Sequence, residues 1–152
     1  DRTNETVDLA VLREGKMLFI DQIVASQRLR TVSSIGETFP LTTTANGKAA
    51  LASVPECQAD TLIVAELAAC SRPSSDLSRL KNELEDVRKT GIAFDEDEHT
   101  KGVSALGFAI NDPGGDVYAI SLPVPSSRYI QQKAALFDVL VECRADFLEQ
   151  TR

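Results

Sequence analysis

The sequence predicts a single α+β domain, in which helices pack against an antiparallel sheet of about six strands. Strand-like segments occur in two groups, and a stretch with helical periodicity separates the groups. Strands that follow one another without crossover helices pair antiparallel, because parallel neighbours need such a crossover. The 152 residues, of which 43% are hydrophobic, are enough to bury a core without metals or disulfides.

A β-hairpin is expected at the start of the chain. Apolar and polar residues alternate over residues 6–12, a second strand is expected over 17–24, and Gly15 marks the turn between them. In the first strand, the side chains of Val7, Leu9 and Val11 are expected to point inward. Their neighbours in the strand are expected to point outward. A third strand is expected over 29–35, ending at Gly36.

Three helices are expected in the middle of the chain. The first begins at a capping residue, Thr44 or Asn46, and ends at Pro55, which also opens the second helix. The third has potential caps at 74–76 and Gly91 just beyond its end. Its apolar residues recur at helical spacing, which predicts one buried face: Leu77, Leu80, Leu84 and Val87.

The second group of strands is expected over residues 92–95, 102–110 and 117–124. Gly114 and Gly115 permit positive φ angles in the turn between the last two strands. A long helix is then expected over 126–150. Its main apolar stripe is predicted to be Ile130, Ala134, Phe137 and Val141, widened by Leu136, Val139, Leu140 and Cys143.

The charge and hydropathy of the chain limit its partners. With 16 basic and 23 acidic side chains the formal net charge is −7, the wrong sign for a surface that binds phosphates, so nucleic acid is not expected as a direct ligand. No apolar run is long enough to cross a bilayer and no signal peptide is present, which predicts a cytoplasmic location without membrane contact. Because the chain starts at Asp1, it is interpreted as a trimmed fragment.

The cysteines and the single histidine do not predict a metal centre or a catalytic centre. The three cysteines are widely spaced and form no C-x-x-C motif, which is typical of a protein in a reducing compartment. Cys70 and Cys143 lie beside apolar helical sequence and are expected to be buried, inert thiols. His99 lies among acidic residues of the segment 95–98, a pattern that allows a metal site but is more typical of a solvated turn.

Several motifs occur in sequence along the chain: Glu5-Thr6-Val7, the stretch 40–52 with Gly47-Lys48-Ala49 inside it, and Gly91 followed by Asp95, Glu98 and Gly102. Together they resemble the effector-binding domain of IclR-type bacterial transcriptional regulators, and the resemblance spans nearly the whole chain. It implies a GAF-like fold over 1–152, with a curved sheet, a pocket on one face and a roof formed by loops and the helix that contains Gly47. It also implies homodimers or homotetramers. Operator DNA would be bound by a winged helix-turn-helix domain that this chain lacks, and no cofactor is implied.

The resemblance further implies a ligand-binding site on one face of the sheet. The residues at the matching positions are Arg28, Thr31, Ala45, Asn46, Gly47, Asp95, Val103, Ala105, Ser121 and Pro123. Backbone N–H groups at the helix start near Asn46 are suited to a small organic acid. Ala105 and Pro123 replace polar residues found in members that recognise the smallest acids, which favours a larger or more apolar acid, for example an aromatic catabolic metabolite.

Each of these residues also has a purely structural interpretation. Gly47 can serve close packing, Asp95 can cap the following turn, and Val103 and Ala105 can belong to the core. Two other functions stay open at this point. One is a metal-dependent enzyme that uses His99 with neighbouring carboxylates, and the other is a pure oligomerisation module.

Overall fold

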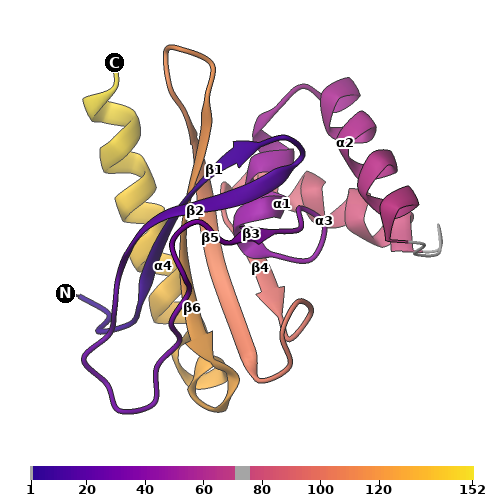
Figure 1. Ribbon diagram of the computed structural model, residues 1–152. Coiled ribbons are helices and arrows are strands. Elements are labelled where there is room, and N and C mark those ends of the chain that lie inside the picture. Colours follow the sequence, from indigo (N-terminus) through magenta and orange to yellow (C-terminus); the bar gives the residue numbers. More distant parts are fainter. Residues whose placement is uncertain (1, 71–75) are drawn as a thin grey trace.

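The fold was analysed in a computed structural model, which describes residues 2–70 and 76–152 (Figure 1). The helices and strands follow one another as β1 (Val7–Arg13), β2 (Lys16–Ile23), β3 (Thr38–Phe39), α1 (Ala45–Ser53), α2 (Glu56–Ala69), α3 (Asp76–Thr90), β4 (Ala93–Glu96), β5 (Val103–Asn111), β6 (Val117–Pro125) and α4 (Ser126–Gln150). This confirms the predicted α+β class and the predicted order of strands and helices.

A single antiparallel sheet forms the centre of the domain. Its strand order is β3-β2-β1-β6-β5-β4, so the first and last groups of strands join where β1 pairs with β6. Helices α1 to α3 lie on one side of the curved sheet and α4 lies on the other (Figure 1). Both faces of the central strands are therefore covered, and each face has its own hydrophobic core.

The predicted third strand over 29–35 is wrong. The chain between β2 and β3 is irregular, and the third strand is the two-residue β3. Leu29, Val32 and Ile35 are more than 60% exposed, so the apolar side chains of this segment do not pack into a core. Backbone groups in the segment are bound by side chains instead of a neighbouring strand; the Thr6 hydroxyl, for example, donates to the carbonyl of Thr31 over 2.8 Å.

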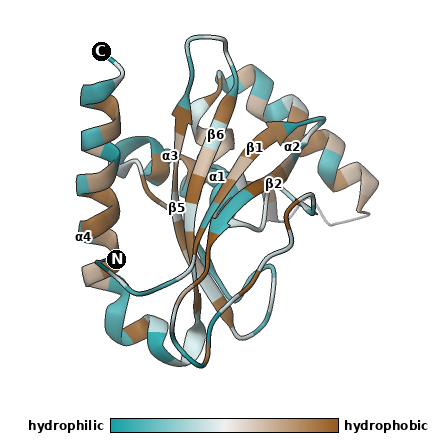
Figure 2. Ribbon diagram, turned by 60° about the vertical axis from the view of Figure 1, so that its left-hand side comes forward, coloured by the Kyte–Doolittle hydropathy of each residue, from teal (hydrophilic) through white to brown (hydrophobic). Residues whose placement is uncertain are grey.

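The predicted main stripe of α4 is also wrong. Ile130 is 84% exposed, and Ala134 and Val141 are exposed as well. The residues that α4 buries are Tyr129, Leu136 and Leu140, and these contact the core beneath the sheet. Because α4 carries hydrophobic residues on more than one side (Figure 2), periodicity alone does not select the side that packs.

Helix ends and turns follow local sequence closely. Thr44 caps α1 by accepting a 3.1 Å hydrogen bond from the backbone of Gly47, Pro55 precedes α2, and Gly91 ends α3 with a φ of +81°. In the β5–β6 turn only Gly115 has the predicted positive φ. Ser74 and Ser75, predicted as caps of α3, lie outside the described residues.

The thiols differ from the prediction in one respect. Cys70 is exposed, because it lies at the end of α2, whereas Cys143 is partly buried against the core under α4. Burial raises the pKa of the Cys143 thiol, which makes it a poor nucleophile. Within residues 2–70 and 76–152 no helix has both the length and the hydropathy needed to cross a membrane.

Candidate functional site

A cavity of about 500 Å³ is lined in part by the β2–β3 segment and the β4–β5 turn. Both segments lie at the same end of the sheet (Figure 1). The volume of the cavity is in the range that encloses metabolite-sized ligands. The lining comes from four parts of the chain: the strands (Asp8, Phe19, Phe39, Asp95, Val103, Ala105, Ser121, Pro123 and Pro125), the start of α1 (Thr44, Ala45 and Asn46), the β2–β3 segment (Leu29 to Ser33 and Glu37) and the β4–β5 turn (His99, Thr100 and Gly102).

Strand register explains the floor of the cavity. Asp8 on β1 lies directly opposite Ser121 on β6, and Ala105 on β5 lies between Pro123 on β6 and Asp95 on β4. Opposed residues of antiparallel strands point to the same face, so both rows project into the cavity. Ala105 and Ser121 have small side chains, which leaves space above the sheet at this point.

The start of α1 forms one polar wall. Asn46 is 3% exposed, and its side-chain oxygen accepts a hydrogen bond of 2.8 Å from the Gly47 N–H. The backbone N–H groups of the first helical turn, including those of Ala45 and Asn46, have no acceptor within the helix. The positive end of the helix dipole is thus placed at the cavity, a position that favours an anionic or electron-rich group.

The β2–β3 segment covers the cavity and is held by hydrogen bonds to several parts of the chain. Thr6 binds both the carbonyl of Thr31 and the N–H of Ala25, and the Thr31 hydroxyl donates to the carbonyl of Pro123 over 2.9 Å. Arg128 at the start of α4 donates to the carbonyl of Leu29. The roof of the cavity is therefore tied to the residue that precedes β1, to β6 and to the last helix.

Arg128 itself is held by a buried acid. Its guanidinium makes two hydrogen bonds, of 2.6 and 2.8 Å, with the carboxylate of Glu5, whose side chain is 1% exposed. This pair raises the pKa of Arg128 further above its usual range. The Glu5-Thr6 motif in the sequence is thus explained structurally: both residues position the roof segment.

The β4–β5 turn is anchored in a similar way. Asp95 accepts a hydrogen bond of 2.9 Å from the N–H of Glu98, and the side chain of Glu98 reaches Lys48 on α1. Lys48 is 1% exposed; it also pairs with Glu83 on α3 and donates to the carbonyl of Phe94. The Lys48 and Glu98 motif positions therefore hold the turn against α1.

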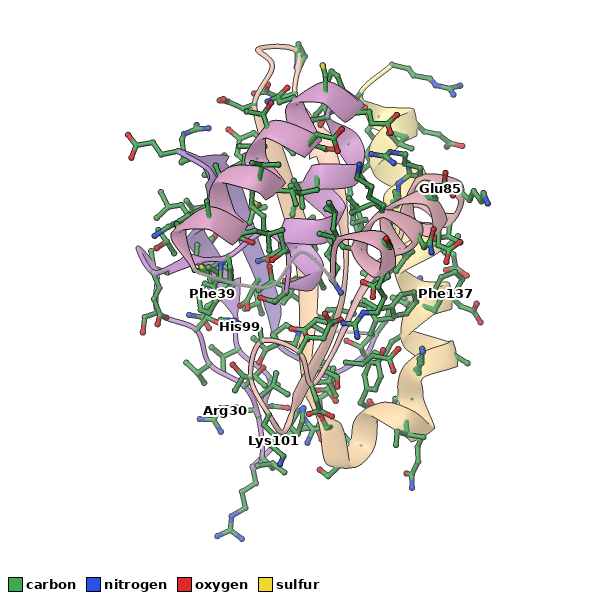
Figure 3. All side chains as sticks on the ribbon, turned by 90° about the vertical axis from the view of Figure 1, so that its right-hand side faces the viewer. Arg30, Phe39, Glu85, His99, Lys101 and Phe137 are labelled. Atoms are coloured by element: carbon green, nitrogen blue, oxygen red, sulfur yellow. The ribbon has the colours of Figure 1, made fainter. Side chains whose placement is uncertain are left out.

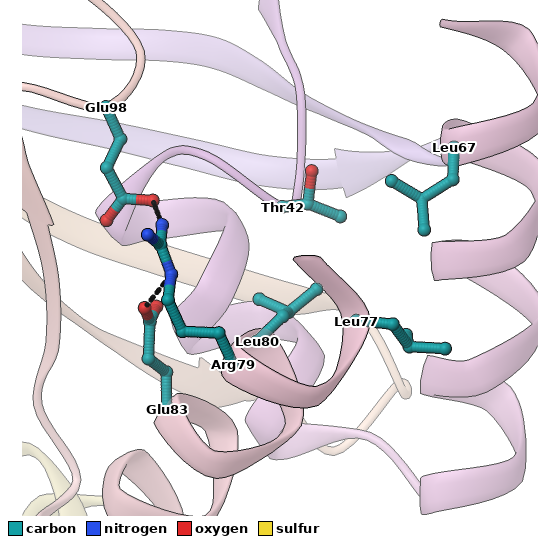
Figure 4. A pocket seen from close by; sticks show the side chains of 7 residues that line it. All are labelled: Thr42, Leu67, Leu77, Arg79, Leu80, Glu83 and Glu98. Atoms are coloured by element: carbon teal, nitrogen blue, oxygen red, sulfur yellow. Dashed lines mark ion pairs between the residues drawn. The ribbon is translucent and has the colours of Figure 1, made fainter. Parts of the chain in front are cut away.

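Arg79 adds to this network from α3 by pairing with Glu83 and Glu98 (Figure 4). The hollow beside it has a volume of about 20 Å³, room for about one water molecule, so it is not a candidate site for an organic ligand.

His99 is placed at the mouth of the cavity rather than in a metal centre. Its ring meets the ring of Phe39 edge to face, with 5.1 Å between centroids (Figure 3). Within the part of the chain that the structure describes, no three histidine, cysteine or acidic side chains gather as metal ligands. The donor geometry therefore does not support the alternative of a metal-dependent enzyme.

Two buried carboxyl groups give the cavity its electrostatic character. Desolvation raises the pKa of Asp8 from its ordinary value of 3.8 to about 6, although a hydrogen bond from Ser33 opposes the shift. Desolvation also raises the pKa of Asp95, against hydrogen bonds from the backbone of Glu98 and His99. Both groups thus resist ionisation more than exposed carboxylates do.

We expect Asp8 to make the domain less stable as the pH rises. An acid whose pKa is higher in the folded protein holds its proton there when the unfolded chain has lost it, so stability falls between pH 3.8 and about 6. The difference in unfolding free energy between the wild type and Asp8→Asn should change by up to about 3 kcal/mol across this window. Urea denaturation at pH 4 and pH 7.5 measures it, with the exposed Asp21→Asn as the matched control. An equal difference at both pH values would contradict the burial of this carboxylate.

The structure brings most of the predicted site residues together. Of that set, the cavity is lined by Thr31, Ala45, Asn46, Asp95, Val103, Ala105, Ser121 and Pro123. Arg28 is exposed on the β2–β3 segment and is not among the lining residues. Gly47 is not among them either: a Cβ atom there would lie 2.5 Å from the backbone of Leu41, so this glycine permits close packing.

Asp8 is the main lining residue that the sequence interpretation did not identify. The alternation in the first strand suggested that Val7 and Leu9 point inward and that Asp8 points to solvent, whereas Asp8 is 1% exposed. Because both faces of the sheet are covered, the alternation of apolar and polar residues did not distinguish buried from solvent-exposed positions. The available signal was an acidic residue within a strand whose other residues, apart from the terminal Arg13, are apolar.

Comparisons with known proteins show relatives over nearly the entire chain. The family described as "Bacterial transcriptional regulator IclR C-terminal" matches residues 1–147. The chain is 39% identical over 139 residues to the HTH-type transcriptional regulator Rv1719 of Mycobacterium tuberculosis, covering 91% of this chain and 54% of that protein. It is 30% identical over 144 residues to the HTH-type transcriptional regulator TtgV of Pseudomonas putida, covering 95% and 55%.

A solved structure agrees with these relatives. The crystal structure of Thermotoga maritima IclR superimposes with a TM-score of 0.79 at 27% identity, over 95% of this chain and 60% of that one. The chain thus spans about half the length of the relatives that it matches.

Proposed function

Because the chain belongs to the IclR family of bacterial transcriptional regulators and corresponds to their C-terminal domain, we propose that it binds a small organic effector in the cavity above β1, β4, β5 and β6. The observation that carries the proposal is the lining itself. Buried polar groups from Asp8, Asn46 and Ser121 border a space of about 500 Å³ that the protein does not fill. Buried polar groups beside unfilled space are suited to orienting a ligand.

The effector is proposed to be a small organic acid. Its carboxylate would accept hydrogen bonds from the first turn of α1, near Asn46, where helix geometry supplies unsatisfied N–H groups. Phe19, Phe39 and Val103 supply apolar contacts for the remainder of the molecule. A volume of about 500 Å³ is larger than an acid of a few atoms needs, which supports an aromatic or alicyclic acid.

In the full-length protein we propose that this domain is joined to a helix-turn-helix domain and forms homodimers or homotetramers. Two of the relatives are named HTH-type transcriptional regulators, and this chain matches only about half of their length, which supports that arrangement. An effector that binds one arrangement of the subunits more tightly would shift the DNA-binding equilibrium, and a few kcal/mol of differential affinity are sufficient. Such a protein would act as a regulator and not as an enzyme.

The proposal is tested by screening organic acids for ligand-induced stabilisation of the purified domain. A compound present at a free concentration of a hundred times its dissociation constant should add about 2.7 kcal/mol to the unfolding free energy. If no acid in a broad catabolic library raises the melting temperature, effector binding is contradicted. A stable dimer or tetramer under the same conditions would then favour the pure oligomerisation module.

Filling the cavity should remove this stabilisation. Ser121 is 4% exposed and lies beside Asp8 on the floor, so Ser121→Leu is expected to abolish the ligand-induced shift by occupying ligand space. Ala105→Leu should have the same effect from the adjacent strand, whereas Ser127→Leu on the exposed surface of α4 should retain the shift. Melting temperatures without ligand establish that each variant folds. A full ligand response in both cavity variants would contradict the placement of the site.

A further inference from the structure

Asp8 is a lining residue of the cavity that has a fully buried acceptor atom without a hydrogen-bond partner among the described residues. Its carboxyl group is buried, at 1% exposure, and one oxygen accepts a hydrogen bond of 3.0 Å from the Ser33 hydroxyl. The other oxygen, Oδ1, has no hydrogen-bond partner in the described parts of the chain. None of the ion pairs found among the described residues involves Asp8.

A buried acceptor without a partner is unfavourable and rare in native proteins. The two other acids that are buried among the described residues are held differently. Asp95 caps the β4–β5 turn by accepting from two backbone N–H groups, and Glu5 binds Arg128 through both of its oxygens. Asp8 combines burial, a position on the cavity and an acceptor atom without a partner among the described residues.

The other charged or titratable groups on the cavity leave this acceptor without a built-in cation. Arg30 is exposed and donates to the carbonyl of Gln27, and Glu37 is exposed and accepts from the N–H of Ser34. His99 packs on Phe39, and Asp95 is acidic. A donor carried by the ligand can supply the partner that these groups do not.

We infer that Asp8 is a specificity-determining residue, which accepts a hydrogen bond from a hydroxyl or ammonium group of the effector. The inference rests on the proposed function and narrows it: the effector carries a hydrogen-bond donor in addition to the acid group that docks at α1. Simple unsubstituted acids then leave the Asp8 acceptor unpaired and bind more weakly. Discrimination is strong where a site has a buried polar group for the substituent, because the analogue without it leaves that group unsatisfied.

The experiment uses matched triplets of acids: an unsubstituted parent, its hydroxyl derivative and its amino derivative. Cyclohexanecarboxylate with its 4-hydroxy and 4-amino derivatives is one triplet, and butyrate with the corresponding derivatives is another, within a broad library built in the same way. Calorimetry gives the dissociation constants for the wild type, Asp8→Asn and Asp8→Ala. Asp21→Asn, an exposed acid on the neighbouring strand, is the matched control.

The wild type and Asp21→Asn should bind at least one donor-bearing derivative about tenfold or more tightly than its parent. Asp8→Ala should lose this preference. Asp8→Asn, which keeps the shape and an acceptor oxygen, should retain part of a hydroxyl preference and lose an ammonium preference, and so distinguishes the two donors. Its folding is checked by the melting temperature without ligand.

The failures of the two hypotheses differ. If parents bind as tightly as their derivatives, or if Asp8→Ala keeps the wild-type preference, the inference about Asp8 is wrong although the cavity is an effector site. If no member of the library binds the wild type, the proposed function is itself contradicted, and the inference about Asp8 is overturned with it.

Discussion

Arg128→Met is expected to destabilise the domain by about 3–5 kcal/mol, because it leaves the Glu5 carboxylate buried without a counter-ion. Glu5 is 1% exposed, and both of its oxygens accept hydrogen bonds from the Arg128 guanidinium. The same arginine holds the Leu29 carbonyl, so the roof of the cavity should loosen as well. Chemical denaturation measures the first effect, and hydrogen exchange over residues 24–37 measures the second.

A double-mutant cycle separates the ion pair from other effects. Adding Glu5→Gln to Arg128→Met removes the unpaired charge and should restore a large part of the lost stability. The matched control is Arg13→Met, which breaks the exposed ion pair with Asp116 and should cost about 1 kcal/mol or less. If Arg128→Met and Arg13→Met lower the unfolding free energy equally, the burial of Glu5 does not determine the destabilisation.

Gly47→Ala is expected to destabilise the domain by about 3 kcal/mol or more, at the upper end of the cost of overpacking. The added Cβ atom would lie 2.5 Å from both the Cα atom and the carbonyl oxygen of Leu41, and 2.6 Å from the Thr44 hydroxyl. Two of these contacts are with backbone, which cannot rotate away, so the start of α1 must shift. Such a shift should also weaken the proposed effector binding, because the first turn of α1 borders the cavity.

Gly114→Ala is the control for this prediction. Gly114 also lacks a positive φ, but the nearest atom to its added Cβ would be 3.4 Å away, on the Asp112 side chain. The unfolding free energy of Gly114→Ala should stay within about 0.5 kcal/mol of that of the wild type. The denaturation midpoints of the two variants decide the matter: a wild-type midpoint for Gly47→Ala would contradict the steric role of this glycine.

Local signals in the sequence were sufficient for most helices and strands. Thr44, Pro55 and Gly91 occur at helix ends because their effects depend on the backbone of a few neighbouring residues. The hairpin of β1 and β2 was predictable for the same reason, with Gly15 in its turn at a φ of +75°. Predictions that required knowledge of distant partners were less successful, as the segment 29–35 shows.

Some residues of the candidate site were likewise predictable from the sequence, and others were not. Ser121, Asp95 and Asn46 were expected in one site through the resemblance of motifs, and the structure brings them to one cavity. Arg28 and Gly47 were expected beside them, but neither lines the cavity. Asp8 was not expected, because the alternating pattern of its strand suggested a solvent-facing position.

The sequence by itself determined the α+β class, the order of strands and helices, the family resemblance and the acidic charge. These properties depend on periodicity, capping residues and composition, which are local or additive along the chain. Only the tertiary structure decided which side of α4 is buried, that Glu5 pairs with Arg128, and that Asp8 faces a cavity. The physical reason is that burial and pairing depend on residues far apart in the chain: Glu5 and Arg128 are 123 positions apart, and Asp8 is buried because α1 and the roof segment cover a face that its own strand does not specify.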